Sequence, residues 1–592
     1  MISELNRDFL VSVNLFFTDP RRNPRCRGDT DDTHLRMNKS KFSRWQAILP
    51  AILLIFAGTF AAADDVSDAA GHLLAAEVAL NEQDYRTASE EFRKAAELSD
   101  QVEISRQATE VGFIYGFYDD ALKSVKRWQE LSEDSEEAQL YLARIQMRRG
   151  EYSAARRGFK RLITGDEAED RLLVLISVLV DEDPEAADRV MRSLTKPYKD
   201  SAKAHYAAAV MALAAEDNDY AIKRAQKAIE LEPDWLRPHL LYARALLLNG
   251  EEDEAIEYIA RLIGDDPDPD PEARVELAIM MMSVGRDEDA LSQVNQVLLE
   301  QPSNTEALRL MALINFRLGH FDAAWEDFED LLASGRHTME ARYYLARIAD
   351  MREDYDRAIR LYMQVEAGQH ALAARQRGSA LIAFEQEDPN YALQKLDEFA
   401  QISPSSAVDV TLARARLLSM LERYDESLVE YDKYLGFRSE DEFAILGKAD
   451  LLLRMERLDD ALATYAYALD RFPDSSTTLN AYGYTLADRT DRYKEAADMI
   501  EEALELDPDN SAIIDSWGWV LHKLGRNEEA LTQLERAYSL FDDAEVAAHI
   551  VEVLAALDRR DEALEILEAA ETKQPDSRFL KDVRERHFPD AD

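Results

Sequence analysis

The chain of 592 residues is 46% hydrophobic and 32% charged, and it contains only 20 Gly and 17 Pro. These proportions are typical of a helix-rich folded protein and exclude a disordered one. Because 117 Asp and Glu stand against 70 Lys and Arg, the net charge of −47 repels nucleic acid and anionic lipid headgroups over most of the surface.

The amino-terminal region predicts export. Residues 37–63 read MNKSKFSRWQAILPAILLIFAGTFAAA, in which basic residues precede an apolar stretch, and this is the order found in signal peptides. Ala61 and Ala63 supply an A-x-A cleavage site, so we expect a mature chain that begins at Asp64 and resides in the periplasm of a host with two membranes. An uncleaved inner-membrane anchor is the alternative.

Residues 1–36 are rich in Arg and show no periodicity, and we expect them to be an extension read from an upstream start codon. The only cysteine, Cys26, lies in this extension. A mature chain without it has no thiol for disulfides, for thiolate metal sites or for cysteine catalysis. It also has no cysteine that could carry a lipid anchor after the apolar stretch.

From residue 69 onward one pattern recurs about every 34 residues, a period typical of helical repeats. Its clearest copy, WGWVLHKLGRNEEALTQLERA, places Gly518 twelve residues before Ala530. Two antiparallel helices approach closely only where small side chains face each other, so the spacing predicts a helical hairpin. Nine Ala pairs share it: 76 and 88, 143 and 155, 209 and 221, 243 and 255, 278 and 290, 312 and 324, 346 and 358, 380 and 392, and 449 and 461.

The period predicts about fifteen hairpins over residues 64–577, followed by a capping helix and tail over 578–592. The copies near residues 102 and 168 depart from the pattern, and the second has Leu175 in place of the small first-helix residue, which predicts a break near 164–201. The expected repeats start near residues 69, 102, 136, 168, 202, 236, 271, 305, 339, 373, 408, 442, 476, 511 and 544.

Residues 69–577 resemble an array of tetratricopeptide repeats (TPR), which implies an all-α solenoid wound as a right-handed superhelix. The segments LNAYGYTLADRTDRYKEAADMIEEALELDPDNSAIIDSWGWVLHKLGRNEEAL and EVAAHIVEVLAALDRRDEALEIL resemble a narrower group of Gram-negative envelope proteins. The best-known type in that group is an outer-membrane lipoprotein that binds a carboxyl-terminal processing protease and delivers cell-wall hydrolases to it. The resemblance implies a periplasmic scaffold or adaptor for such partners, although no lipobox cysteine follows the signal here. The alternative is a component of an envelope polysaccharide export or cell-envelope assembly machine.

No catalytic or cofactor motif stands out. The sequence lacks H-E-x-x-H, G-x-S-x-G and the Walker pattern G-x-x-x-x-G-K-[ST], and its ten His are scattered. We therefore predict a protein that is not an enzyme and that uses no cofactor or metal.

Positions five and nine of each first helix line the concave groove in arrays of this type. In this register position nine is Arg144, Arg244, Arg347 and Arg416, and position five is Arg106, Arg309 and Arg377. Guanidinium groups suit carboxylates, so the groove is predicted to hold an acidic segment or a free carboxyl terminus of a protein partner. The alternative is that these arginines pair with acidic residues of neighbouring hairpins.

Two aromatic residues also fall at position nine, in the carboxyl-terminal repeats. Tyr484 and Trp519 are predicted to be aromatic anchors for a partner. For Trp519, packing in the core is the alternative.

Overall fold

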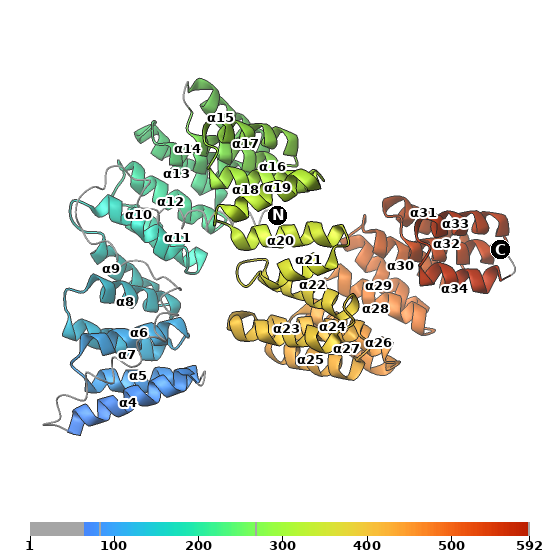
Figure 1. Ribbon diagram of the computed structural model, residues 1–592, viewed down its shortest axis with the longest axis horizontal. Helices are drawn as coiled ribbons and strands as arrows, with labels where there is room; N and C mark the ends of the chain where they lie inside the picture. The colour runs from blue at the N-terminus through green and yellow to red at the C-terminus, as the bar shows by residue number, and fades with distance from the viewer. Residues whose placement is uncertain (1–63, 82–83, 267–268, 590–592) are drawn as a thin grey trace. The chain divides into compact units, whose positions relative to one another are not determined.

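The structure is a computed structural model that describes residues 64–81, 84–266 and 269–589. Within these ranges the regular structure is helical throughout and contains no strand (Figure 1). The expected extension of residues 1–36 and the expected signal peptide of residues 37–63 lie outside the described residues.

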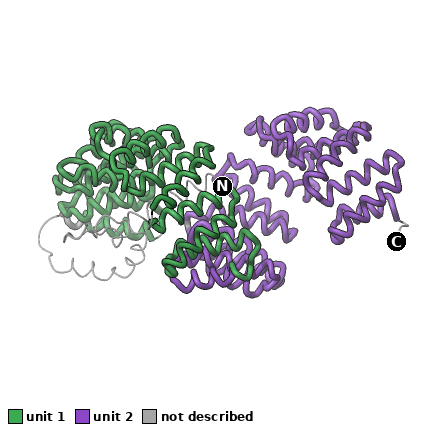
Figure 2. Tube along the Cα trace, turned by 90° about the horizontal axis from the view of Figure 1, so that it is seen from above, with its two compact units in different colours: residues 1–324 green, residues 325–592 purple. Residues whose placement is uncertain are grey.

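The chain divides into two compact units, one ending at Ala324 and the other beginning at Trp325 (Figure 2). The helices of unit 1 are α4 (Asp64–Asn81), α5 (Tyr85–Leu98), α6 (Val102–Ile114), α7 (Tyr118–Leu131), α8 (Glu136–Arg148), α9 (Tyr152–Leu162), α10 (Ala168–Leu179), α11 (Pro184–Thr195), α12 (Ala202–Ala214), α13 (Asn218–Leu231), α14 (Leu236–Leu248), α15 (Glu252–Asp265), α16 (Pro271–Ser283), α17 (Asp287–Glu300) and α18 (Thr305–Arg317).

Helix α19 (Phe321–Ala333) contains the division between the units. The helices that follow it in unit 2 are α20 (Thr338–Met351), α21 (Tyr355–Met363), α22 (Ala371–Phe384), α23 (Pro389–Ile402), α24 (Ala407–Met420), α25 (Tyr424–Phe437), α26 (Glu442–Arg454), α27 (Leu458–Arg471), α28 (Ser476–Arg489), α29 (Tyr493–Leu506), α30 (Ser511–Lys523), α31 (Asn527–Leu540), α32 (Ala544–Ala556), α33 (Arg560–Lys573) and α34 (Arg578–His587).

Even-numbered helices are the first members of the hairpins and odd-numbered helices the second. Many first helices begin at a polar cap: the Ser135 side chain accepts from the N–H of Ala138, and Asn304 does the same for Ala307. The turn into the second helix uses a left-handed residue, such as Gly525 with φ of 78°. The first helices begin within two residues of the expected repeat starts, except that α4 begins at Asp64.

The twelve-residue spacing marks the contact between the two helices of a hairpin. In eight of the nine Ala pairs, both side chains are 0% exposed. The pair of Ala380 and Ala392 is the exception, because Ala380 is only partly buried while Ser379 is 0% exposed. Here the turn is one residue longer. The N–H of Asp388 donates to the carbonyl of Ile382, six positions back, whereas in a regular turn of this array the accepting carbonyl lies five positions back. The extra residue shifts the contact from Ala380 to Ser379.

Helices α10 and α11 depart from hairpin packing. They scarcely touch each other; α10 packs mainly on α12, and α11 packs on α9 and α12. Leu175 of α10 is buried at the position where most first helices have Ala or Gly, and a side chain of this size keeps a facing helix away. The departure falls within residues 164–201.

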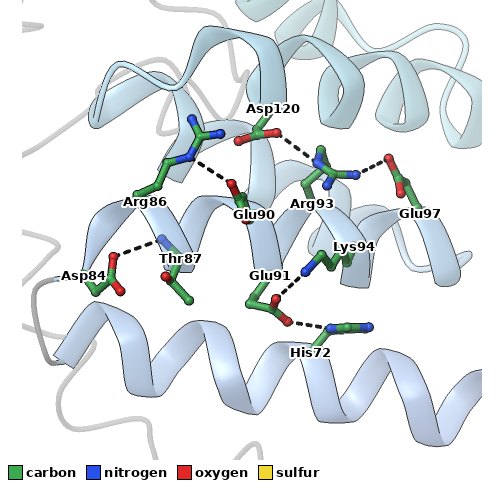
Figure 3. Close-up of polar contacts among 10 residues, drawn as sticks. All are labelled: His72, Asp84, Arg86, Thr87, Glu90, Glu91, Arg93, Lys94, Glu97 and Asp120. Carbon is green, nitrogen blue, oxygen red and sulfur yellow. Dashed lines mark hydrogen bonds and ion pairs between the residues drawn. The ribbon is translucent and has the colours of Figure 1, made fainter.

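Polar side chains join successive helices on the surface of the array. Figure 3 shows the first repeats, where Glu91 of α5 contacts His72 of α4 at 2.6 Å and Lys94 at 2.6 Å. Arg93 lies between Glu97 of its own helix and Asp120 of α7, 2.9 Å from the latter. At the other end of the chain, α34 packs on α32 and buries apolar side chains against it.

Candidate functional site

Two arginines at position nine form mostly buried ion pairs with the following repeat. Arg244 on α14 holds Glu276 on α16, with Nε 2.9 Å from Oε1 and the second nitrogen also bonded to the carboxylate. Arg144 on α8 contacts Glu182, in the turn between α10 and α11, at 2.7 Å. Both guanidinium groups are thus bonded to carboxylates of this chain.

The two position-five arginines with described partners are more exposed. Arg377 on α22 donates two hydrogen bonds to the carboxylate of Asp350 on α20, at 2.7 and 2.8 Å. Arg106 on α6 lies 3.3 Å from Glu110 of its own helix and 3.5 Å from Glu137 on α8. These contacts join consecutive first helices, as do those of Arg244, so the arginines act as links between repeats.

The remaining arginines of the set are also engaged. Arg347 lies about 6 Å from the ring centres of Tyr343 and Tyr344. Arg416 lies beside Tyr431, where burial raises the pKa of the tyrosine and Arg416 opposes the rise. Arg309 likewise interacts with its surroundings.

Helices α28, α30 and α32 bring Tyr484 and Trp519 together with a buried histidine. The His549 ring stacks on Trp519 with centroids 4.2 Å apart, and its Nδ1 lies 2.9 Å from Oδ1 of Asp515. The Tyr484 hydroxyl donates a hydrogen bond of 3.0 Å to Glu545. Trp519, Asp515 and His549 are each 7% exposed, so Trp519 is packed inside the array. We call these five side chains the C-terminal cluster.

The electrostatics of the C-terminal cluster follow from burial and pairing. Burial alone would lower the pKa of His549, but the carboxylates of Asp515, Glu545 and Asp488 together outweigh burial, and the pKa is raised. Burial raises the pKa of Glu545 against the opposing effects of His549 and Tyr484. The ring of His522 also stacks on Trp519, with centroids 5.3 Å apart. Burial lowers the pKa of His522 although Asn527 hydrogen-bonds it.

The contacts among the members of the C-terminal cluster are hydrogen bonds, an ion pair and a ring stack. Among the described residues, no hydroxyl or thiol hydrogen-bonds His549. The neighbouring Ser516 donates its hydroxyl to the carbonyl of Ala512. Across all the residues that the structure describes, no group of three or more His, Cys, Asp and Glu is arranged to hold a metal ion. Nor does any helix of the described ranges combine the length and apolarity needed to span a membrane.

Sequence reasoning missed Asp515, Glu545 and His549. Asp515 and His549 lie 34 residues apart, which is one repeat, and this spacing was a usable signal. Residues one repeat apart on first helices are stacked neighbours, so opposite charges at that distance predict a pair.

The C-terminal cluster should make stability depend on pH. A histidine whose pKa is higher in the folded protein than in the unfolded one, where it is about 6.5, stabilises the fold. The contribution is complete below about pH 6.5, and it is lost as the pH rises through the folded pKa. The raised pKa of Glu545 acts in the same direction, whereas the lowered pKa of His522 costs stability as pH falls. We expect the urea midpoint of the last repeats to fall as the pH rises above about 6.5, the unfolded pKa of histidine.

Two variants test this assignment. His549→Gln should remove most of the fall in the urea midpoint on the alkaline side, and His522→Gln should leave it in place. A wild-type midpoint that rises with pH over this range would contradict the assignment.

Comparisons with known proteins agree with this architecture. Family models described as tetratricopeptide repeat match residues 137–164, 212–274, 253–314, 309–374 and 446–511. A TPR repeat-containing protein of Pseudomonas aeruginosa is 32% identical over 212 residues, which is 36% of each chain. Anaphase-promoting complex subunit 7 of Arabidopsis thaliana is 21% identical over 292 residues, 49% of this chain and 52% of that one. The chain thus spans between about a third and about half of the length of these relatives.

Solved structures of low identity are also similar. The Cut9–Hcn1 hetero-tetramer of the APC/C has a chain that is 13% identical, with 88% of this chain and 97% of that chain covered and a TM-score of 0.33. Yeast Tom70 is 14% identical, with 89% and 98% covered and a TM-score of 0.30. Taken with the repeat matches, the helices define an all-α solenoid of tetratricopeptide repeats. This fold generally serves as a non-catalytic scaffold suited to protein binding.

Proposed function

We propose that the chain is an exported, non-enzymatic scaffold that holds protein partners in the periplasm. The observation that carries the proposal is a row of exposed apolar side chains on consecutive repeats. Met351, Phe384 and Met420 end helices α20, α22 and α24 and are 53%, 43% and 57% exposed. A contiguous exposed apolar patch marks an interaction site, and we propose that these three side chains, which stand at the same, final position of consecutive first helices, form one. We call these three residues the apolar row.

The specific partner we propose is a carboxyl-terminal processing protease together with its cell-wall hydrolase substrates. What supports this is the resemblance of the last repeats to envelope adaptors, together with the signal peptide predicted for residues 37–63. A scaffold of stacked hairpins offers an extended surface, so it can hold an enzyme and a substrate at the same time.

The proposal is tested by capture from the cell envelope. Tagged full-length chain should fractionate with the periplasm, begin at Asp64, and copurify with a processing protease. Changing the three side chains of the apolar row to Ser should abolish copurification. The matched control changes Val429, Leu506 and Leu540 to Ser, because these are second-helix residues of the same unit with similar exposure, and it should leave capture intact.

Three results would contradict the proposal. One is a retained Met1 or Met37, which would argue against cleavage after residue 63. Another is copurification with polysaccharide export or envelope assembly components instead of a protease. The third is equal loss of capture in both triple variants, which would remove the apolar row as the binding surface.

A further inference from the structure

A cavity of about 540 Å³ lies where the repeat packing is irregular. Its walls come from the second helices α9 and α11 and from the turns that follow them. Because α11 packs on α9 and scarcely on α10, the cavity lies at the α10–α11 repeat, where hairpin packing is lost. The Tyr198 hydroxyl donates to the carbonyl of Ile163 at 3.3 Å, which ties the two turns together and fixes one wall.

Three cations line this cavity in a strongly acidic protein. Arg156, Arg157 and Lys160 all belong to α9 and are exposed. Arg156 donates to the hydroxyl of Ser193 at 3.2 Å. Within the described residues none of the three forms an ion pair with a carboxylate, in contrast to Arg144 of the preceding helix, which binds Glu182. The cavity is therefore a positive site whose charges are available to a ligand.

The rest of the wall combines apolar side chains with the hydroxyl groups of Thr164 and Ser193. Ile163, Leu194 and Tyr198 line the cavity beside the three cations. A ligand that fits both features has carboxylates for the cations and an apolar side chain for the walls. A long nucleic acid does not fit, because the net charge of −47 repels an extended polyanion on every side of so small a positive site.

We infer that this basic cavity binds an acidic peptide segment of a protein partner. Arg156, Arg157 and Lys160 hold its carboxylates, and the apolar side chains of the wall hold a neighbouring aliphatic or aromatic side chain. The inference rests on the proposed scaffold function and adds the chemistry of a recognition segment to it. It places charge recognition in the irregular repeat of unit 1, separate from the apolar row of unit 2.

The test uses full-length chain and a short fluorescent peptide of repeated Glu-Glu-Leu, with binding followed by anisotropy. The triple variant Arg156→Gln, Arg157→Gln, Lys160→Gln should bind about 10- to 100-fold more weakly, since charge-assisted contacts are lost. The control triple Lys123→Gln, Lys126→Gln, Lys223→Gln removes the same charge from exposed second-helix lysines of unit 1. It should change binding by less than about twofold, because screened surface charges contribute little.

Three outcomes would overturn the inference. Equal weakening in both triples would mean general attraction to a basic surface. No weakening in the first triple would remove the cavity as the site. Tighter binding of an oligothymidylate than of the peptide, lost in the first triple, would assign the cavity to nucleic acid.

The same variants separate this inference from the proposed function. If the first triple loses the peptide while wild-type chain captures no envelope protein, the cavity stands and the scaffold function falls. If capture depends on the apolar row and the peptide binds equally to wild type and the first triple, the scaffold function stands and the cavity falls.

Discussion

Replacing Glu276 with Ala is expected to destabilise the packing of α14 on α16 by about 3–5 kcal/mol. The side chains of Arg244 and Glu276 are only 12% and 10% exposed, so the substitution leaves a largely buried guanidinium without its main counter-charge. Amides of both helices should then exchange with solvent at least about a hundredfold faster, because the local opening free energy falls by that amount.

The controls for this prediction separate pairing from a general effect of charge removal. Arg286 and Asp289 form an exposed pair on the same unit, with side chains 46% and 54% exposed. Asp289→Ala should cost less than about 1 kcal/mol. The double variant Arg244→Met, Glu276→Leu should recover most of the loss, because an apolar pair of similar volume replaces the buried charges. If Glu276→Ala costs no more than Asp289→Ala, the pair of Arg244 and Glu276 does not hold α14 on α16.

Substituting Ala530 with Leu should destabilise the α30–α31 hairpin by about 1–3 kcal/mol through overpacking. Ala530 is 0% exposed, and a Cβ placed on the facing Gly518 would lie 2.6 Å from Cγ of Leu534 and 3.2 Å from the carbonyl oxygen of Ala530. The helices therefore have no room for a larger side chain at this contact. Hydrogen exchange of α30 and α31 should accelerate about 5- to 150-fold.

Ala569→Leu is the matched control, since Ala569 lies on the exposed face of the second helix of the next repeat. It should leave exchange unchanged or slightly slower, because Leu is nearly as good a helix former as Ala. Equal acceleration in the two variants would mean that Ala530 does not face the first helix.

Much of the fold could be predicted because the packing is local and periodic. A contact between two helices of one hairpin depends on two residues at a fixed separation, so Gly518 and Ala530 are visible in the sequence as a repeated spacing. The failure at Ala380 has an equally local cause. One extra residue in the turn before Asp388 moves the contact to Ser379, and a pattern that counts residues cannot detect an insertion that leaves Ala at both counted positions.

The arginine contacts could not be predicted in the same way. Glu182 lies 38 residues after Arg144, and Glu276 lies 32 residues after Arg244. Asp350, in contrast, lies 27 residues before Arg377. These separations share no period, because long side chains reach different turns of the neighbouring helix. The sequence therefore placed the arginines by position in the repeat, while their partners depended on rotamers and on the exact stacking of helices.

The basic cavity was outside the reach of repeat reasoning for a different reason. Arg156, Arg157 and Lys160 lie on a second helix, which the regular array directs away from the groove. Their significance arises from the irregular packing of α10 and α11, which is a property of tertiary structure. Leu175 signalled that the packing changes there, but it did not indicate what the change would expose.

The hydrogen bond from Tyr484 to Glu545 connects α28 with α32, two repeats further along the chain. In a solenoid linked only through adjacent repeats, one hairpin can open with little effect on another two places away. Opening α28 would also deprive the half-buried carboxyl group of Glu545 on α32 of its hydrogen-bond donor, and that adds to the cost of opening. The three hairpins that begin with α28, α30 and α32 should therefore unfold together under a pulling force. A force that a partner applies to one of them is resisted by all three.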